Sequence, residues 1–185
     1  PYDRCISRGV VGSMMPVVYN NGNQILQAPG YVVLRNEMIH ETRVIPLDGR
    51  PHLPAVMESY MGDSRGSWDG DTLVVDTVGF NEAAWMDRSA MPHTDRLHTV
   101  ERLTRRDFDT LDYTVTFDDP GAYTAPWTSG YTKRWEKGTE LFEYVCNENK
   151  TFHEHWVGTR SDAERSEVTI AADTLAKYAG NYTER

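Results

Sequence analysis

The sequence predicts an all-β protein, either an antiparallel barrel of the lipocalin-like type or a β-sandwich. About eight to ten short segments have strand character, and turn residues interrupt them roughly every 8–12 residues, as in sandwiches and barrels. Residues 110–117 alternate most clearly, because large apolar side chains at odd-numbered positions alternate with polar ones at even-numbered positions. Aromatic residues, which favour pleated and half-buried surfaces, make up 11% of the chain.

The strand segments lie between an irregular start and a short tail. Residues 1–22 have no clean period and are expected to form an N-terminal arm, whereas residues 173–185 are expected to form a tail or a linker to a following module. The β domain is expected over residues 23–172. Its strand segments, in chain order, are 23–28, 31–35, 38–45, 72–80, 97–105, 110–117, 124–137, 139–149 and 151–160.

Turn chemistry separates these segments. An Asn-Asn-Gly sequence ends the arm, Pro-Gly stops the first strand, and residues 46–65 are expected to be loop-rich. The Trp-Asp-Gly-Asp sequence at 68–71 predicts a hairpin turn into 72–80, which is apolar on both sides and therefore central in its sheet. Residues 81–96 are expected to connect strands. Pro126 predicts an edge position for 124–137.

Composition and charge exclude some classes of partner. The chain has 185 residues, 39% hydrophobic content and a formal net charge of −9, which predicts one main globular domain. Such an acidic chain is not expected to bind nucleic acid or an anionic membrane surface. No apolar run approaches the length that membrane insertion needs. The chain begins at Pro1 without an initiator methionine, so we expect a processed or truncated start.

The loop-rich stretch holds the first candidate site. Arg50 offers a planar guanidinium suited to an anion, and His52 can exchange a proton near neutral pH. With Asp63 they are the candidate catalytic residues, and Ser64 and Arg65 are candidate ligand-binding residues in a glycine-flanked sequence. The structural alternative is that these side chains brace their own loops.

Three further ligand-binding candidates lie in the segment 38–45, and one lies in the aromatic-rich segment 124–137. An inward-facing Glu41/Arg43 pair or an inward-facing His40 would be a polar group retained inside for a reason. The alternative is a solvated pair that contributes little to stability. Trp127 either faces a ligand or belongs to an aromatic-rich core.

No cofactor is expected, apart from a weak indication of a divalent metal. His153 and His155 are two residues apart and would share one face of a strand, so they could bind zinc or copper with one remote ligand. A surface strand explains the two histidines equally well. Cys5 and Cys146 either pair across most of the chain or remain free thiols.

Several longer phrases resemble a widespread family of secreted bacterial proteins with no assigned activity. The phrases are MIHETRVIPLDGRPH, YMGDSRGSWDGDTLVV, VERLTR, DDPGAYTAPW and FEYVCNEN. The resemblance extends from Cys5 to about residue 160. It implies a periplasmic or extracellular location and a Cys5–Cys146 disulfide, and it implies no catalytic or binding residue.

Three functions are compatible with these observations. The first is a secreted β domain that binds a small ligand, anionic, aromatic or sugar-like, through the Arg/His/Asp loops at the mouth of the barrel. The second is an acid–base enzyme that uses His52 with Arg50 and Arg65 in the same pocket. The third is a structural protein that self-associates through a strand edge and has no site.

Overall fold

The computed structural model describes residues 5–16, 21–84, 86, 91–144 and 146. The chain divides into two compact units, Pro1–Glu148 and Asn149–Arg185, and every described residue belongs to the first. The predicted strand 151–160, His153, His155 and the predicted tail therefore lie outside the described residues.

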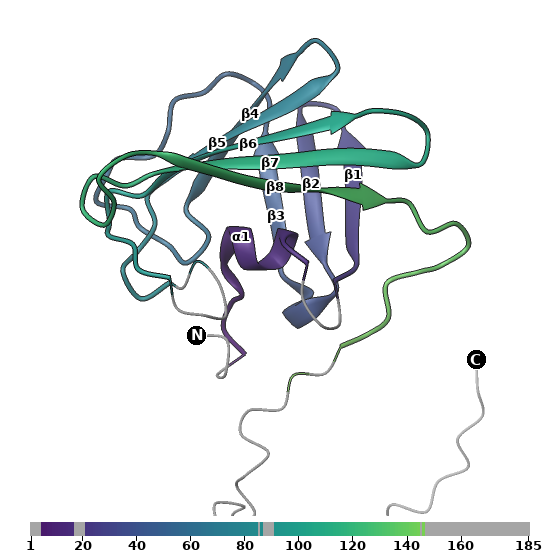
Figure 1. Ribbon diagram of the computed structural model, residues 1–185, viewed down its shortest axis with the longest axis horizontal. Coiled ribbons are helices and arrows are strands. Elements are labelled where there is room, and N and C mark those ends of the chain that lie inside the picture. Colours follow the sequence, from purple (N-terminus) through teal and green to yellow (C-terminus); the bar gives the residue numbers. More distant parts are fainter. Residues whose placement is uncertain (1–4, 17–20, 85, 87–90, 145, 147–185) are drawn as a thin grey trace, which may run out of the picture. The chain divides into compact units, whose positions relative to one another are not determined.

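The described residues form two antiparallel sheets, which confirms the all-β prediction (Figure 1). The smaller sheet has the order β1-β2-β3, with β1 at Asn23–Ala28, β2 at Tyr31–Asn36 and β3 at Thr42–Pro46. The larger sheet has the order β4-β5-β6-β7-β8. Its strands are β4 (Asp63–Asp69), β5 (Thr72–Val78), β6 (His98–Arg105), β7 (Thr110–Asp118) and β8 (Trp127–Arg134).

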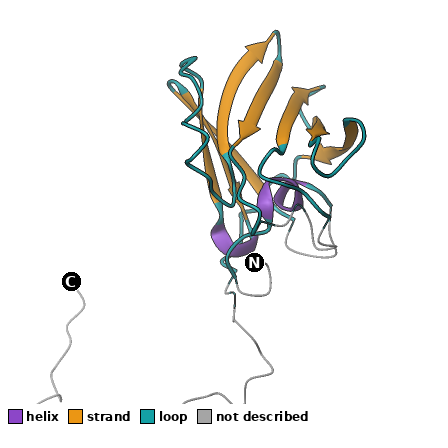
Figure 2. Ribbon diagram, turned by 90° about the vertical axis from the view of Figure 1, so that its left-hand side faces the viewer, coloured by secondary structure: helices purple, strands orange, loops and turns teal. Residues whose placement is uncertain are grey.

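Each strand pairs with its neighbour in the sequence, so each sheet is a meander of hairpins. β3 is not hydrogen-bonded to β4 in this topology, and the two sheets remain open rather than closing into one barrel. The strands of the smaller sheet cross those of the larger sheet in Figure 1, and Figure 2 shows the two sheets as separate layers. Of the two predicted architectures, the sandwich describes this arrangement.

The core lies between the inner faces of the two sheets. It combines Val32, Leu34 and Ile45 from the smaller sheet with apolar residues of the larger sheet, among them Leu73, Val75, Leu103, Tyr113, Val115 and Phe117. The short helix α1 (Gly9–Met14) also contributes, because Val10, Val11 and Met14 are buried in the same cluster. The arm predicted to be irregular thus contains one helical turn that packs on the core.

One predicted strand begins too early and another is absent where the structure describes them. Met38–His40 forms a 3-10 turn in which Ile39 and His40 have positive φ angles of 63° and 56°, so the strand predicted from residue 38 begins only at Thr42. Residues of L configuration rarely adopt this left-handed conformation. The strand predicted for 139–149 is absent from the described residues 139–144, which carry no regular structure.

One strand was missed. Residues 63–69, interpreted from the sequence as loop and hairpin turn, form β4. Gly66 explains the position of this strand, because a Cβ atom there would lie 2.6 Å from a Leu47 side-chain atom and 2.8 Å from one of Ile45. The glycine therefore permits the smaller sheet to approach closely at β4.

Candidate functional site

Five polar side chains gather on the outer face of the larger sheet, and we call them the outer-face cluster. His52 comes from the loop before β4, Asp63 and Arg65 from β4, Asp76 from β5 and His98 from β6. Arg65 is the register partner of Asp76. Alternation along β5 determines the face, since the residues on both sides of Asp76 are completely buried in the sandwich while Asp76 itself is part-exposed.

The histidines and aspartates of the cluster are connected by hydrogen bonds. His52 Nδ1 lies 2.9 Å from Asp63 Oδ2, and His52 Nε2 lies 2.7 Å from Asp76 Oδ1. The second oxygen of Asp76 lies 2.7 Å from His98 Nε2. Ionised carboxylates only accept hydrogen bonds, so both bonds of His52 are satisfied only when its ring carries two protons.

His98 differs from His52 because, in the described part of the chain, only one of its ring nitrogens has a hydrogen-bond partner. Its Nε2 donates to Asp76, and among the described residues no group hydrogen-bonds to Nδ1. A neutral His98 therefore presents an unprotonated Nδ1 as an acceptor. The side chains of His98 and Asp76 are 38% and 41% exposed, which leaves both within reach of a ligand from solvent.

Asp63 and Arg65 hold the preceding loop on the sheet. The Leu53 amide donates to Asp63 at 2.9 Å, Arg65 Nη1 donates to Asp63 at 2.5 Å, and Arg65 Nε donates to the Pro51 carbonyl at 3.1 Å. Burial by itself would raise the pKa of Asp63, but hydrogen bonds from Leu53, His52 and Arg65 outweigh it and lower this pKa below its ordinary value. The ionised carboxylate thus stabilises the folded state.

Asp63→Asn is expected to lower the free energy of unfolding by about 1–2 kcal/mol at pH 7. The folded-state pKa lies below the unfolded one, so this stabilisation is complete above about pH 4 and is lost as the pH falls through the folded pKa. Urea unfolding of wild type and variant at pH 7 and at about pH 2.5 measures the difference. An equal difference at both pH values would contradict the role of the ionised carboxylate.

The other loop candidates lie elsewhere. Arg50 forms an exposed ion pair with Asp48, and its Nε lies 2.8 Å from Asp48 Oδ2. This pairing lowers the pKa of Asp48 to about 2. Ser64 points into the sandwich, where its hydroxyl lies 3.0 Å from that of Thr77. The structure therefore brings His52, Asp63 and Arg65 together, on the outer face of a sheet, without Arg50 or Ser64.

The candidates of segment 38–45 are also separated. His40 accepts a hydrogen bond from the Tyr144 amide at 3.2 Å. Burial raises the pKa of Glu41, against the opposing effect of hydrogen bonds that include one from Ser13 at 3.3 Å. In the aromatic segment, the ring of Trp127 stacks on Phe117 with centroids 4.1 Å apart, which places Trp127 against the core.

Arg43 takes part in a buried ion pair between the sheets. Its Nη2 lies 2.6 Å from Glu101 Oε2, and the two side chains are 6% and 0% exposed. The Tyr113 hydroxyl donates to Glu101 Oε1 at 2.9 Å. Burial first, and then the neighbouring carboxylate of Glu101, raise the pKa of Tyr113. Arg43 thus faces inward, as one alternative predicted, but its ion-pair partner is on the other sheet.

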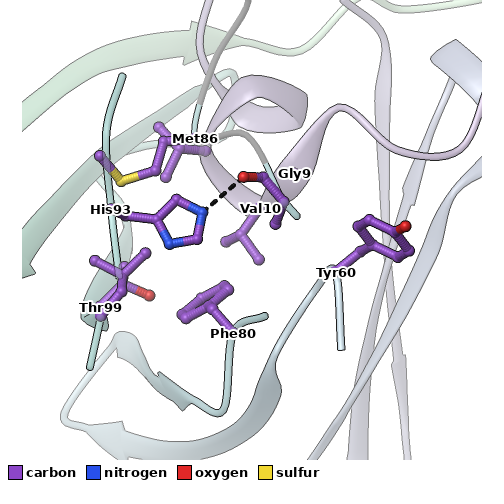
Figure 3. A pocket seen from close by; sticks show the side chains of 10 residues that line it. Gly9, Val10, Tyr60, Phe80, Met86, His93 and Thr99 are labelled. Carbon is purple, nitrogen blue, oxygen red and sulfur yellow. Dashed lines mark hydrogen bonds between the residues drawn. The ribbon is translucent and has the colours of Figure 1, made fainter. Parts of the chain in front are cut away.

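A small cavity lies beside α1, away from the outer-face cluster (Figure 3). Figure 3 shows the His93 ring between Phe80 and Met86; its Nε2 lies 2.8 Å from the Ala84 carbonyl oxygen. The cavity has a volume of about 10 Å³, which admits roughly one water molecule. Its volume is far below that of a pocket for a drug-sized ligand.

No family model, curated protein or solved structure matches this chain. The functional argument therefore depends on side-chain geometry. Within the described residues, no group of three or more His, Cys, Asp or Glu side chains is arranged to hold a metal. The same part of the chain contains no helix long and apolar enough to cross a membrane.

Sequence reasoning missed two members of the cluster, Asp76 and His98. A charge in the middle of the apolar strand 72–78 was the available signal for Asp76. His98 and Glu101 are three residues apart in the sequence, which places them on opposite faces of β6. Only the strand register brings His98 next to Asp76.

Proposed function

We propose that the protein binds a small, hydroxyl-bearing, sugar-like ligand at the outer-face cluster. The observation that carries the proposal is the Asp76 carboxylate held between His52 and His98 at 2.7 Å each. Three elements of the chain contribute to this arrangement, so the fold determines the positions of its polar atoms. Preorganised polar groups lose little freedom when a ligand binds.

The free atoms of the cluster favour a ligand that donates hydrogen bonds. Neutral His98 offers an acceptor at Nδ1, and Asp76 offers the remaining lone pairs of a part-exposed carboxylate. Hydroxyl groups can donate to both. An anion is disfavoured, because the charge of Arg65 is already paired with Asp63 and the part-exposed carboxylate of Asp76 offers only acceptor oxygens, which repel an anion.

Acid–base chemistry is the second candidate, and the Asp76–His98 contact favours it. A carboxylate that orients a histidine, with the other ring nitrogen lacking a hydrogen-bond partner among the described residues, is the arrangement of a general base. His52, the residue that the sequence suggested for this role, has both nitrogens occupied. The reaction would thus use His98 as the base, with Asp76 as its positioning residue.

A periplasmic or extracellular location is part of the proposal. The structure contains the Cys5–Cys146 disulfide, and such bonds persist mainly in oxidising compartments. A sugar-like ligand is compatible with that setting. Self-association through a strand edge remains a prediction of the rival structural role.

Binding is tested by titrating the protein with neutral mono- and disaccharides and with the corresponding uronic acids, followed by NMR of the histidine ring signals. We expect a neutral sugar to shift the His98 signals and to bind at least about tenfold more weakly to His98→Phe and Asp76→Asn, the loss of about 1.4 kcal/mol. Arg102→Ala is the matched control, because Arg102 lies on the same face of β6 and pairs with Asp69.

Two outcomes would contradict sugar binding at this cluster. The first is that no neutral sugar shifts the His98 signals at concentrations up to about 100 mM, well above the millimolar range of weak complexes. The second is that the control and His98→Phe lose affinity equally. Preferential binding of the uronic acids would show that the ligand is an anion rather than a neutral hydroxyl-bearing compound.

A further inference from the structure

We propose that β1 is a docking edge at which a second copy of this chain adds its own β1, so that the smaller sheets of two molecules join into one. β1 lies at one edge of the smaller sheet (Figure 1), and β2 is its only strand partner in the described part of the chain. Alternate backbone N–H and C=O groups of an edge strand point away from its sheet and remain unpaired. The proposed ligand site lies on the other sheet, so this inference is independent of it.

The free side of β1 is open to solvent. Residues 24–28 are all exposed, and the large apolar side chains of Ile25 and Leu26 are 39% and 45% exposed. Among the described residues, none outside β2 forms a backbone hydrogen bond with residues 24–28. The unpaired backbone groups are therefore accessible to another strand.

The other three edges of the two described sheets are protected. β8, the edge strand that Pro126 predicts, carries Lys133 and Arg134 at its end, and charged side chains on an edge oppose pairing with another strand. On β4, Arg65 donates a hydrogen bond to the preceding loop. The edge of β3 approaches β4 closely at Gly66. None of these three edges presents an open, uncharged strand.

β1 has none of the features that prevent edge pairing. Its sequence, NQILQA, contains no charge, proline or glycine, although 25% of the chain is charged. Its register with β2 is unbroken over all six residues, so no bulge twists the edge away. Natural proteins use charges, prolines and bulges to block such edges. Their absence from β1 favours an occupant that is itself a β-strand.

A second copy supplies a strand that matches this edge. Two β1 strands can pair antiparallel about a twofold axis, which is the commonest symmetry of protein dimers. Every cross-strand pair would then be uncharged, so the net charge of −9 on each chain places no like charges opposite each other in the ladder. On the outer face of the smaller sheet, Leu26, Val33 and Val44 form a row of register partners. Pairing would place Leu26 of one copy beside Leu26 of the other and continue this row across the dimer.

The expected dimer is weak, because two six-residue strands form a contact at the small end of specific interfaces. We expect a dissociation constant of about 0.1–1 mM. Sedimentation equilibrium of the full chain between about 10 μM and about 2 mM should show the average mass rising from one chain toward two. Hydrogen exchange of the backbone amides in β1 should slow as the dimer fraction rises. A mass of one chain throughout this range would overturn the proposal.

Leu26→Lys tests the edge directly. It places two lysines beside each other near the twofold axis and should weaken the dimer at least about tenfold. Val44→Lys is the matched control, because Val44 is 54% exposed on the same face but lies on β3, away from the free edge. The control should dimerise within about threefold of wild type. Equal weakening by the two variants would assign the contact to the face rather than to the edge and would overturn strand pairing.

Circular dichroism establishes that both variants are folded. If Leu26→Lys does not fold, the concentration dependence of amide exchange in wild-type β1 decides. Slow exchange of these amides that does not change with concentration would mean that a strand of the same chain covers the edge. That result would also overturn the proposal.

Discussion

Arg43→Met, with Glu101 left in place, is expected to lower the free energy of unfolding by about 3–5 kcal/mol. Removing the guanidinium leaves the Glu101 carboxylate in a site where its side chain is 0% exposed. The Tyr113 hydroxyl at 2.9 Å would then be its remaining partner, and one neutral donor cannot replace a cation. Urea unfolding at pH 7, followed by tryptophan fluorescence and far-UV circular dichroism, measures the loss.

The stability lost in Arg43→Met should be recovered when Glu101 and the Tyr113 hydroxyl are also replaced by apolar groups. In Arg43→Met/Glu101→Leu/Tyr113→Phe, both charges of the ion pair and the hydroxyl that donates to it are removed together, and apolar side chains of similar size fill the space. Such replacements are often neutral or stabilising, so we expect stability within about 1 kcal/mol of wild type. This outcome would distinguish a penalty for an unpaired charge from a favourable contribution of the ion pair itself.

Arg102→Ala is the matched control for this series. Arg102 is adjacent to Glu101 in β6 but lies on the outer face, where it pairs with Asp69 at 2.6 Å with both side chains well exposed. Exposed pairs contribute about 0–1 kcal/mol. A similar loss for Arg43→Met and Arg102→Ala would contradict the argument from burial.

The fold class could be predicted because local patterns determine it. In β7 the alternation read from residues 110–117 matches the burial of Tyr113, Val115 and Phe117. A polar residue inside a strand is harder to assign. The sequence left two alternatives for Arg43, and only contact with a strand of the other sheet identifies its ion-pair partner.

β4 was missed because its residues have strong turn propensity. Gly62, Asp63, Gly66 and Asp69 each favour a loop when considered alone. Pairing with β5 along the whole strand outweighs that propensity, and the glycine at 66 is required by the neighbouring sheet. Tertiary contacts of this kind have no signature within a short window of sequence.

The outer-face cluster could be predicted only in part, for the same reason. His52 and Asp63 are 11 residues apart and flank one loop, so local reasoning connects them. Asp76 and His98 are 22 residues apart and meet because β5 and β6 pair in a particular register. Arg50 seemed an equal candidate in sequence, but its nearest carboxylate is Asp48, two residues away.

Removing the Cys5–Cys146 disulfide is expected to cause the second large loss of stability. Cys5 and Cys146 are bonded across a sequence separation of 141 residues, which confirms the pairing. In the chain-entropy model, closing a loop of this length stabilises the folded state by about 5 kcal/mol. Cys5→Ser/Cys146→Ser should lose about that amount, a large share of the roughly 5–15 kcal/mol typical of a domain.

The location of the disulfide determines which part of the fold should open first when the bond is removed. Cys5 precedes α1, and this helix has only six residues, too few to be stable without tertiary packing. When the bond is absent, α1 and its core residues Val10, Val11 and Met14 are held by packing alone. We therefore expect hydrogen exchange of α1 amides to accelerate more than that of β6 and β7.

Reduction of the wild-type protein with dithiothreitol provides the same test without mutation. The thermal midpoint of the reduced protein should match that of the double serine variant, and both should lie far below that of the oxidised protein. Treating the double serine variant with dithiothreitol controls for effects of the reagent. A loss below about 1 kcal/mol in both cases would mean that the unfolded chain gains little freedom when the bond is cut. The disulfide would then serve to order the N-terminal segment rather than to stabilise the domain.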